Sequence, residues 1–366
     1  MAKRIIISGG GTGGHIFPAI AIANALRRLA PDTVLLFVGA NGKMEMEKVP
    51  AAGFEIVGLD IQGVNRQSPL KNITLPFKLF KSIRAARAII RDFRPDVAVG
   101  VGGYASGPLL YSATKMRVPS LIQEQNSYAG ITNKRLAKKA DCVCVAFEGM
   151  ERFFPKDKIL FTGNPIRREA VTIAHKRAEA LASFGLSEDR KTILLTGGSL
   201  GARTLNESML GGLDKLLEAN VQVLWQCGTY YYESLREKLP SSYDGQVKLM
   251  AFQQRMDLAY AAADIIIARA GAGTIAELCV IAKPTILVPS PNVAEDHQTK
   301  NAQALVGKNA ALMVDDAEAP RTLISIALGL LSNQRESESM SANLEKLAML
   351  NADEVIAREV LKLAGG

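Results

Sequence analysis

The sequence lacks the features that mark several protein classes. No apolar run approaches the roughly 18 residues that cross a bilayer, and the short segment before Ile5 lacks the layout of a signal peptide. We therefore expect a cytoplasmic chain without a membrane span. The four cysteines, Cys142, Cys144, Cys227 and Cys279, lack metal-ligand spacing, which predicts reduced thiols with a structural role.

Two further absences restrict the ligand class. Aromatic residues make up only 6% of the chain and no zinc-binding pattern occurs, which argues against a nucleic-acid-binding protein. The chain also contains no Asp-x-Asp motif, the usual acidic handle for a metal-bound sugar nucleotide. We therefore expect neither a metal nor a cofactor.

Size and charge suggest two unequal halves. A chain of 366 residues with 48% hydrophobic content can form two cores. The net charge of +8 is unevenly divided, because residues 1–163 carry +11 and residues 164–366 carry −3. The basic half should attract nucleic acid, an anionic membrane surface or a phosphorylated substrate.

A glycine-rich segment follows the first apolar stretch. The run from Ile5 to Gly14 places five glycines after a predicted strand and ends beside His15, one of only three histidines. Helical spacing follows from Ala19, so the glycines precede a helix N-terminus, where phosphate or sugar can contact bare backbone. A purely structural turn is the alternative. A dinucleotide site is disfavoured because no acid ends the next strand, residues 34–38.

The same pattern occurs twice along the chain. Residues 95–122 and 263–288 both show a strand, a glycine turn, a helix and a second strand, and residues 192–201 repeat the opening strand with glycines. We predict an α/β protein with two doubly wound, parallel-sheet, Rossmann-like domains facing one cleft. The join should lie near residues 163–165.

Six motifs in order resemble those of the MurG family, bacterial cell-wall N-acetylglucosaminyltransferases of the GT-B fold. They are Gly10–His15, Gly102–Pro108, Glu124–Asn126, Gly163–Arg167, Gly197–Ala202 and Gly271–Glu277. The resemblance implies inverting transfer of N-acetylglucosamine from UDP-N-acetylglucosamine to the 4-hydroxyl of undecaprenyl-diphosphate-linked muramoyl pentapeptide (lipid I), giving lipid II. It assigns residues 1–163, with a C-terminal helix of about 345–366 packed back on them, to the acceptor and the membrane. Residues 164–344 would then bind the donor.

Inverting transfer needs a base for the acceptor hydroxyl. His15 suits this role because histidine ordinarily titrates near neutral pH, with a helix-capping histidine as the alternative. His175 is expected in a polar, solvated helix after the domain join, and His297 in a loop that the resemblance places near the donor. Glu124 is a second catalytic candidate, or it orients a neighbour. Gln123 departs from the histidine of many family members, so an acid–base role there is doubtful.

The resemblance also implies the donor contacts. Arg167 and Ser199 would bind the diphosphate, Glu277 the ribose hydroxyls, and Gln298 and Asn126 the transferred sugar. The complete predicted UDP-N-acetylglucosamine set is Thr12, Gly13, Gly14, Asn126, Arg167, Ser199, Gln253, Ala272, Gly273, Thr274, Ile275, Glu277 and Gln298, and the acceptor set is Gly102, Gly103 and Tyr104.

Residues 73–94 predict a helix with a cationic edge. Leu79, Ile83, Ala86 and Ile90 form one apolar stripe, whereas Phe80 lies among the arginines. The predicted membrane contacts are Phe80, Arg84, Arg87 and Arg91. We expect a peripheral protein at the cytoplasmic face of the cell (inner) membrane, with cell-wall assembly proteins as possible partners. A second helix should begin near Ser339 and continue through Val360.

Related activities remain open at this stage. A UDP-N-acetylglucosamine 2-epimerase or a diacylglycerol glycosyltransferase would share the donor loops and differ on the acceptor side. The Gly102–Pro108 and Glu124–Asn126 motifs favour the cell-wall transferase.

Overall fold

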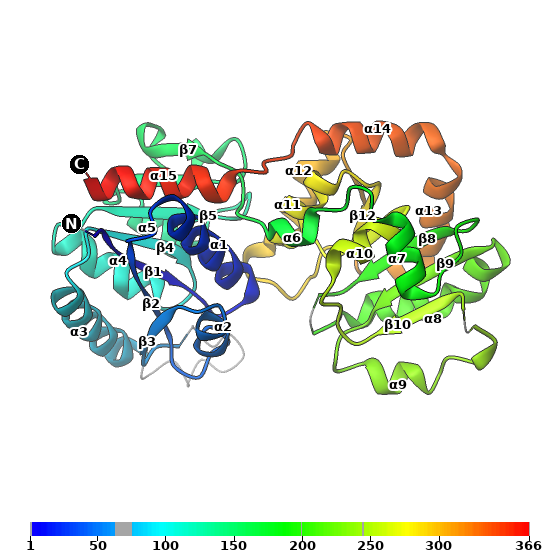
Figure 1. Ribbon diagram of the computed structural model, residues 1–366, viewed down its shortest axis with the longest axis horizontal. Helices are drawn as coiled ribbons and strands as arrows, with labels where there is room; N and C mark the ends of the chain where they lie inside the picture. The colour runs from blue at the N-terminus through cyan, green and yellow to red at the C-terminus, as the bar shows by residue number, and fades with distance from the viewer. Residues whose placement is uncertain (1, 63–74, 199, 244, 366) are drawn as a thin grey trace. The chain divides into compact units, whose positions relative to one another are not determined.

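The computed structural model describes residues 2–62, 75–198, 200–243 and 245–365. It divides into two compact units (Figure 1). We call Met1–Ile166 together with Met349–Gly366 unit 1, and Arg167–Ala348 unit 2. The boundaries predicted from the sequence, after residue 163 and near residue 345, lie a few residues before these.

Unit 1 alternates strands and helices from its first strand onward. Its elements are β1 Arg4–Gly9, α1 Gly13–Leu29, β2 Val34–Ala40, α2 Glu45–Ala51, β3 Glu55–Leu59, α3 Leu75–Phe93, β4 Val97–Gly102, α4 Ser106–Lys115, β5 Ser120–Glu124, α5 Ile131–Leu136, β6 Cys142–Val145, the 3-10 turns Met150–Arg152 and Lys156–Lys158, β7 Ile159–Phe161, and α15 Ala352–Gly365.

The sheet of unit 1 is parallel, with strand order β3-β2-β1-β4-β5-β6-β7. Side chains alternate along β1, so Ile5 and Ile7 pack under α1 and α15, whereas Ile6 packs under α3 and α4. Both faces are therefore covered. The strand order reverses between β1 and β4, and ligands of such sheets bind at that switch point.

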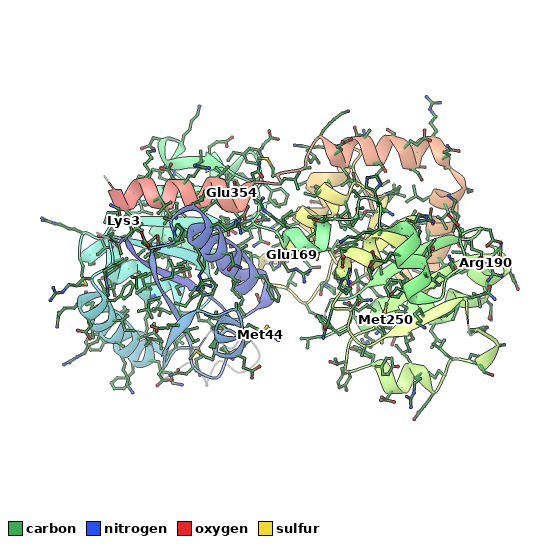
Figure 2. All side chains as sticks on the ribbon, viewed as in Figure 1. Lys3, Met44, Glu169, Arg190, Met250 and Glu354 are labelled. Carbon is green, nitrogen blue, oxygen red and sulfur yellow. The ribbon has the colours of Figure 1, made fainter. Side chains whose placement is uncertain are left out.

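Helix α15 completes the first core although it follows unit 2 in the sequence. Ile356, Ala357 and Val360 are fully buried against the α1 side of the sheet. Lys3 Nζ donates to the carbonyl of Ala364 at 2.6 Å, and Figure 2 shows Lys3 beside this helix. Arg28 pairs with Asp353 at 2.7 Å at its other end.

Unit 2 repeats the alternation. Its elements are α6 Arg168–Val171, α7 Arg177–Phe184, β8 Lys191–Thr196, α8 Arg203–Glu218, β9 Val221–Gln226, α9 Tyr232–Arg236, the 3-10 turn Ser241–Tyr243, β10 Val247–Met250, α10 Met256–Ala262, β11 Ile265–Ala268, α11 Ala272–Ile281, β12 Thr285–Leu287, the 3-10 turn Ala294–Asp296, α12 His297–Val306, β13 Leu312–Met313, α13 Ala319–Ser332 and α14 Gln334–Glu345.

The second sheet is also parallel, with order β10-β9-β8-β11-β12-β13. Its first five strands follow the same spatial order as β3-β2-β1-β4-β5, with the switch between β8 and β11. The predicted fold class, two doubly wound Rossmann-like domains, is confirmed.

Two local predictions are wrong. The helix expected from Ser339 through Val360 is two helices, α14 and α15, because their buried residues belong to different cores: Met340 and Leu344 to unit 2, Ile356 to unit 1. Leu79, assigned to the buried stripe of α3, is 43% exposed. Ser82 is buried in its place, where its hydroxyl donates to the carbonyl of Asp60.

The four cysteines lie in the interior of the two units. Cys142, Cys144, Cys227 and Cys279 are buried free thiols. Over the described ranges, no helix combines the length and apolarity needed to span a bilayer.

Candidate functional site

The first glycine loop, Gly10–Gly14, connects β1 to α1 at the switch point of unit 1. Gly10 N donates to the carbonyl of Gly102 at 3.2 Å, so the loop lies against the turn that ends β4. A Cβ at Gly103 would lie 2.2 Å from Gly10 O, and Gly103 has φ +90°, so only glycine fits there. This packing brings predicted donor and acceptor residues of unit 1 together.

His15 lies in the first turn of α1, directly beside this contact. Its Nδ1 is 3.1 Å from the carbonyl oxygen of Val101 and 3.1 Å from Gln125 Oε1. A carbonyl oxygen can only accept, so Nδ1 carries the proton in the neutral ring and Nε2 carries the lone pair. In this tautomer Nε2 carries no proton, as a general base requires.

A buried amide network fixes the position of Gln125. Its Nε2 donates to Val101 O at 2.5 Å and to Gln123 Oε1. Gln123 Nε2 donates to Asn164 Oδ1 at 2.9 Å, and Asn164 Nδ2 donates to Gln125 O at 2.9 Å. Gln123 therefore helps to hold Gln125 in place, and Gln125 in turn contacts His15.

Glu124 is 2% exposed and both its carboxylate oxygens have donors. Oε1 accepts from the backbone N–H of Asn126 at 3.1 Å and from its Nδ2 at 3.4 Å. Oε2 accepts from Gly130 N at 3.1 Å and from Asn133 Nδ2 at 2.9 Å. The carboxylate therefore organises the loop from Asn126 to α5.

The remaining predicted residues of unit 1 lie close to the first glycine loop. Thr12 is the exposed N-cap residue of α1, and no acidic side chain occupies the first turn. Tyr104 is 45% exposed. A Cβ added at Gly11 would lie 3.5 Å from its ring, which is ordinary van der Waals distance, so the ring lies next to this loop.

Unit 2 contains a cavity of about 850 Å³ at its own switch point. The second glycine loop, Gly197–Gly201, and the third glycine loop, Gly271–Thr274, both contribute to its wall; Ser199 lies outside the described residues. The lining residues are Thr196, Gly197, Gly198, Leu200, Gly201, Ala202, Arg203, Thr204, Tyr231, Arg269, Gly271, Thr274, Ser290, Pro291, Asn292, Gln298 and Asp316. This volume lies within the usual range for a small-molecule site.

Arg269 supplies a cation to this cavity and is held firmly. Its Nη1 lies 2.5 Å from Asp316 Oδ1 and 3.0 Å from the carbonyl oxygen of Val288. Thr204 Oγ1 donates to the other oxygen of Asp316 at 2.9 Å. Only 15% of the Arg269 side chain is exposed, so its orientation is set by these partners.

Arg167, whose side chain is 41% exposed, pairs with the buried Glu277 elsewhere in unit 2. Glu277 Oε1 accepts from Arg167 Nε at 3.1 Å and from Nη2 at 3.0 Å, and Oε2 accepts from the Tyr260 hydroxyl at 2.9 Å. Burial, followed by the charge of Glu277, raises the pKa of Tyr260 well above its ordinary value, which keeps this hydroxyl a donor. The geometry brings these two predicted residues together as a pair.

The third glycine loop leads into the first turn of α11. Gly271 is the N-cap and has no side chain to cap the helix, and no acid lies in the first turn. Ala272 and Ile275 are buried, whereas Gly273 and Thr274 are partly exposed. A helix N-terminus without an internal anion favours an external one.

Two predicted glutamines already have hydrogen-bond partners within unit 2. Gln253 N donates to Gln226 Oε1 at 3.0 Å, and Gln298 Oε1 accepts from Ser290 N at 2.9 Å. Thr274 and Gln298 line the cavity, whereas Arg167, Gln253 and Glu277 are absent from its described lining.

The predicted membrane residues lie on α3. Phe80 is 67% exposed and its neighbour Phe77 74% exposed, and Arg84, Arg87 and Arg91 are exposed as well. The first residues of the predicted stretch, Ile73 and Thr74, fall outside the described part of the chain.

Sequence reasoning missed Arg269, Asp316 and Tyr231 in the cavity of unit 2 and Glu45 beneath the first glycine loop. Arg269 stands two residues before the third glycine loop, a position that could have marked it. Within the described ranges, no group of three or more histidine, cysteine or acidic side chains could hold a metal ion.

Two family models match the chain. The glycosyltransferase family 28 N-terminal domain matches residues 5–145, and the C-terminal domain of the same family matches residues 192–356. The two matches fall on unit 1 and unit 2, respectively, apart from the last residues of the second.

Full-length relatives are similar as well. A Parabacteroides distasonis protein named UDP-N-acetylglucosamine–N-acetylmuramyl-(pentapeptide) pyrophosphoryl-undecaprenol N-acetylglucosamine transferase is 55% identical over 98% of each chain. The crystal structure of Acinetobacter baumannii MurG is 29% identical, with a TM-score of 0.80 over 98% of this chain and 99% of that one. A UDP-N-acetylglucosamine 2-epimerase structure, 14% identical with a TM-score of 0.64 over 100% of this chain and 97% of that one, shares the fold alone.

Proposed function

This chain belongs to the MurG family of N-acetylglucosaminyltransferases within glycosyltransferase family 28, and we propose that unit 2 binds the donor and unit 1 the acceptor. The enzyme transfers N-acetylglucosamine from UDP-N-acetylglucosamine to the 4-hydroxyl of lipid I, giving lipid II. The 55% identity to the Parabacteroides distasonis transferase over nearly the full chain carries this conclusion.

The cavity of unit 2 supports donor binding there. It has the volume of a nucleotide-sugar site, and the third glycine loop starts a helix whose dipole favours a diphosphate. Arg269, held by its ion pair with Asp316, lies in the same wall as Thr274, one of the predicted donor contacts. Gln298, also in the lining, is suited to the transferred sugar because an amide both donates and accepts.

Glu277 is the proposed ribose ligand. A carboxylate oxygen has two lone pairs, so Oε2 can accept a ribose hydroxyl in addition to Tyr260. Arg167 fixes the other oxygen by a two-pronged contact. Its predicted diphosphate contact remains a proposal, since the same guanidinium holds Glu277 in this structure.

His15 is the proposed general base. Nε2 accepts the proton of the acceptor hydroxyl while that oxygen bonds to the anomeric carbon, and the carbon–oxygen bond to UDP breaks with its electron pair leaving on UDP. The Nδ1–H, held by Val101 and Gln125, fixes the ring for this step.

Glu124 suits a positioning role better than proton transfer. Its four hydrogen bonds occupy both oxygens and orient Asn126, a predicted contact of the transferred sugar. Gly102, Gly103 and Tyr104 remain the proposed acceptor contacts.

The surface of α3 is the proposed membrane contact. Arginines attract anionic headgroups, and an exposed aromatic residue suits the interface between headgroups and acyl chains. We infer a peripheral location at the cytoplasmic face of the cell (inner) membrane. Association with other cell-wall assembly proteins is a further expectation from the family.

One experiment tests both the reaction and its metal dependence. The purified protein is given labelled UDP-N-acetylglucosamine, with and without a lipid I analogue and with and without EDTA. We expect the label to appear in the lipid fraction only when the lipid I analogue is present, and to the same extent with and without EDTA. Conversion of the donor without an acceptor would indicate the epimerase alternative, and label lost with EDTA would contradict metal-independent transfer.

A further inference from the structure

Glu45 is a buried carboxylate that none of the proposed functional steps uses. It is the first residue of α2, directly after Met44, which is labelled in Figure 2, and its side chain is fully buried. Oε2 accepts from Gly11 N at 2.9 Å, and Oε1 accepts from Ala40 N at 3.0 Å. One carboxylate thus joins the end of β2 to the first glycine loop.

The surrounding backbone is shaped to admit this side chain. A Cβ at Gly10 would lie 2.2 Å from Glu45 Oε1, and a Cβ at Gly39 would lie 2.6 Å from Glu45 Cγ. Any larger residue at either position would displace the carboxylate. Two glycines, one in the loop and one in β2, therefore make room for a single acid.

Glu45 has no counter-ion in the part of the chain that the structure describes. Among the residues that the structure describes, Glu45 forms no ion pair, and its hydrogen-bond partners are the two backbone amides. Burying a carboxylate without a counter-ion is unfavourable, so the arrangement is a poor way to stabilise a fold. A role in the reaction accounts for it better.

The carboxylate determines the path of the loop that carries His15. Gly10 is held on one side by Gly102, and Glu45 lies on the other. Thr12 O, next along the chain, accepts from His15 N at 3.1 Å and so starts α1. Displacing Gly11 would therefore shift the imidazole.

We propose that Glu45 is a positioning residue: its carboxylate takes the Gly11 amide that a phosphate takes in nucleotide-binding loops, and so holds Thr12–His15 in the geometry for proton abstraction. The internal anion also closes this amide to phosphate, which suits a loop facing a sugar hydroxyl. The inference rests on the proposed role of His15.

Glu45→Gln is the primary test, with Glu47→Gln on the exposed side of the same helix as its control. The amide keeps the volume but turns one N–H toward a backbone donor. Misplacement of a reacting group by about 1 Å costs on the order of 100-fold in rate, so we expect kcat to fall roughly 10- to 100-fold. The KM for UDP-N-acetylglucosamine should change less than kcat, because the cavity and most of the predicted donor contacts lie in unit 2.

Gly10→Ala tests the same contact from the other side, because its Cβ displaces the carboxylate without removing it. We expect a similar loss of kcat, and the double variant Gly10→Ala with Glu45→Ala should be no slower than Glu45→Ala alone. Losses that multiply would overturn the proposal.

Stability measurements separate positioning from folding. A lowered Tm with unchanged kcat at a temperature where the protein is folded, or failure of both Glu45→Gln and Gly10→Ala to fold, would assign Glu45 to fold stability and overturn the proposal. His15→Ala distinguishes the two hypotheses. If His15→Ala keeps full turnover, the base assignment fails; if only His15→Ala is slow, the Glu45 proposal fails.

Discussion

The first and third glycine loops follow the same local pattern of strand, glycines and helix, yet their backbone amides face different partners. In unit 1, the carboxylate of Glu45 accepts from Gly11 and fills the space beside Gly10. In unit 2, Gly271 and Thr274 line a cavity of about 850 Å³ that also contains Arg269. One loop has an internal anion, and the other is open to an external one.

This difference between the two loops shows that a glycine motif does not by itself identify a phosphate site. Anions are stabilised at helix N-termini whether they come from a ligand or from the chain. Which anion a glycine loop binds depends on the neighbouring segment. In unit 1 that segment is α2 with Glu45, and in unit 2 it is Arg269 with its partners. Substitutions in each unit should accordingly affect different kinetic constants.

The largest expected effect is on the chemical step in unit 1. His15→Ala should lower kcat by roughly 10²- to 10⁴-fold, because a general base contributes on that scale. The dissociation constant for UDP, measured by calorimetry, should not change. His175→Ala, exposed on unit 2, is the control, and equal rates for both variants would remove His15 from the mechanism.

The next effect concerns the basic surface of unit 1. Replacing Phe80, Arg84, Arg87 and Arg91 by glutamine should weaken binding to anionic vesicles about 100-fold, since each arginine near such a surface contributes about 1 kcal/mol. Tyr230, Arg236 and Arg335 of unit 2, replaced in the same way, serve as the control. Vesicle sedimentation checks both, and retained binding of the α3 variant argues against membrane contact through this helix.

A smaller effect should appear in donor affinity through unit 2. Glu277→Gln removes a charged acceptor of the proposed ribose contact and weakens the hold on Arg167, so we expect UDP to bind about 10-fold more weakly. Glu218→Gln, at the exposed C-terminal end of α8, is the matched control. Unchanged UDP affinity with lowered kcat would move Glu277 from binding to catalysis.

The smallest effect is on stability and depends on pH. The hydrogen bonds from Arg255 and then Lys176 hold the pKa of Asp257 far below its ordinary value, despite its burial. The stability from this carboxylate is therefore present above the unfolded pKa, about 4, and is lost as pH falls through the folded value. Asp257→Asn should lower stability at pH 7 by about 1 kcal/mol, or about 2–4 °C in Tm.

Calorimetry across pH checks this prediction. The Tm difference between the native protein and Asp257→Asn should narrow as pH is lowered from 7 towards 3, and only in the transition of unit 2. Asp92→Asn, exposed on α3 of unit 1, should show no such narrowing. A difference independent of pH would contradict the linkage.

The sequence predicted the fold because its signals are local. Strands ending in glycines and helices with a 3.6-residue period recur in both halves, and they place the switch-point loops correctly. Leu79 was misplaced because periodicity defines a helix face only approximately. In α3 the buried position is occupied by Ser82, whose hydroxyl donates to the carbonyl of Asp60. The break before α15 was missed because apolar residues recur at helical spacing on both sides of it, and only the tertiary fold assigns the two helices to different cores.

The candidate site was predictable only where a motif carried it. His15 and Thr274 lie in glycine motifs. Arg167 and Glu277 also lie in motifs, but they are 110 residues apart in sequence, so no local pattern predicts that they form a pair. Glu45 was missed for the same reason: on a short helix it resembles Glu47, and only burial against Gly10 distinguishes them.

The position of α15 has a consequence for biosynthesis. Ile356, Ala357 and Val360 belong to the hydrophobic core of a unit whose described strands are all synthesised before residue 162. At about 5–20 residues per second, the ribosome needs roughly 10 to 40 s to translate residues 167–348 in between. During that interval the α1 side of the first sheet lacks its last helix, so unit 2 can mature first and a nascent-chain chaperone has an apolar surface to cover.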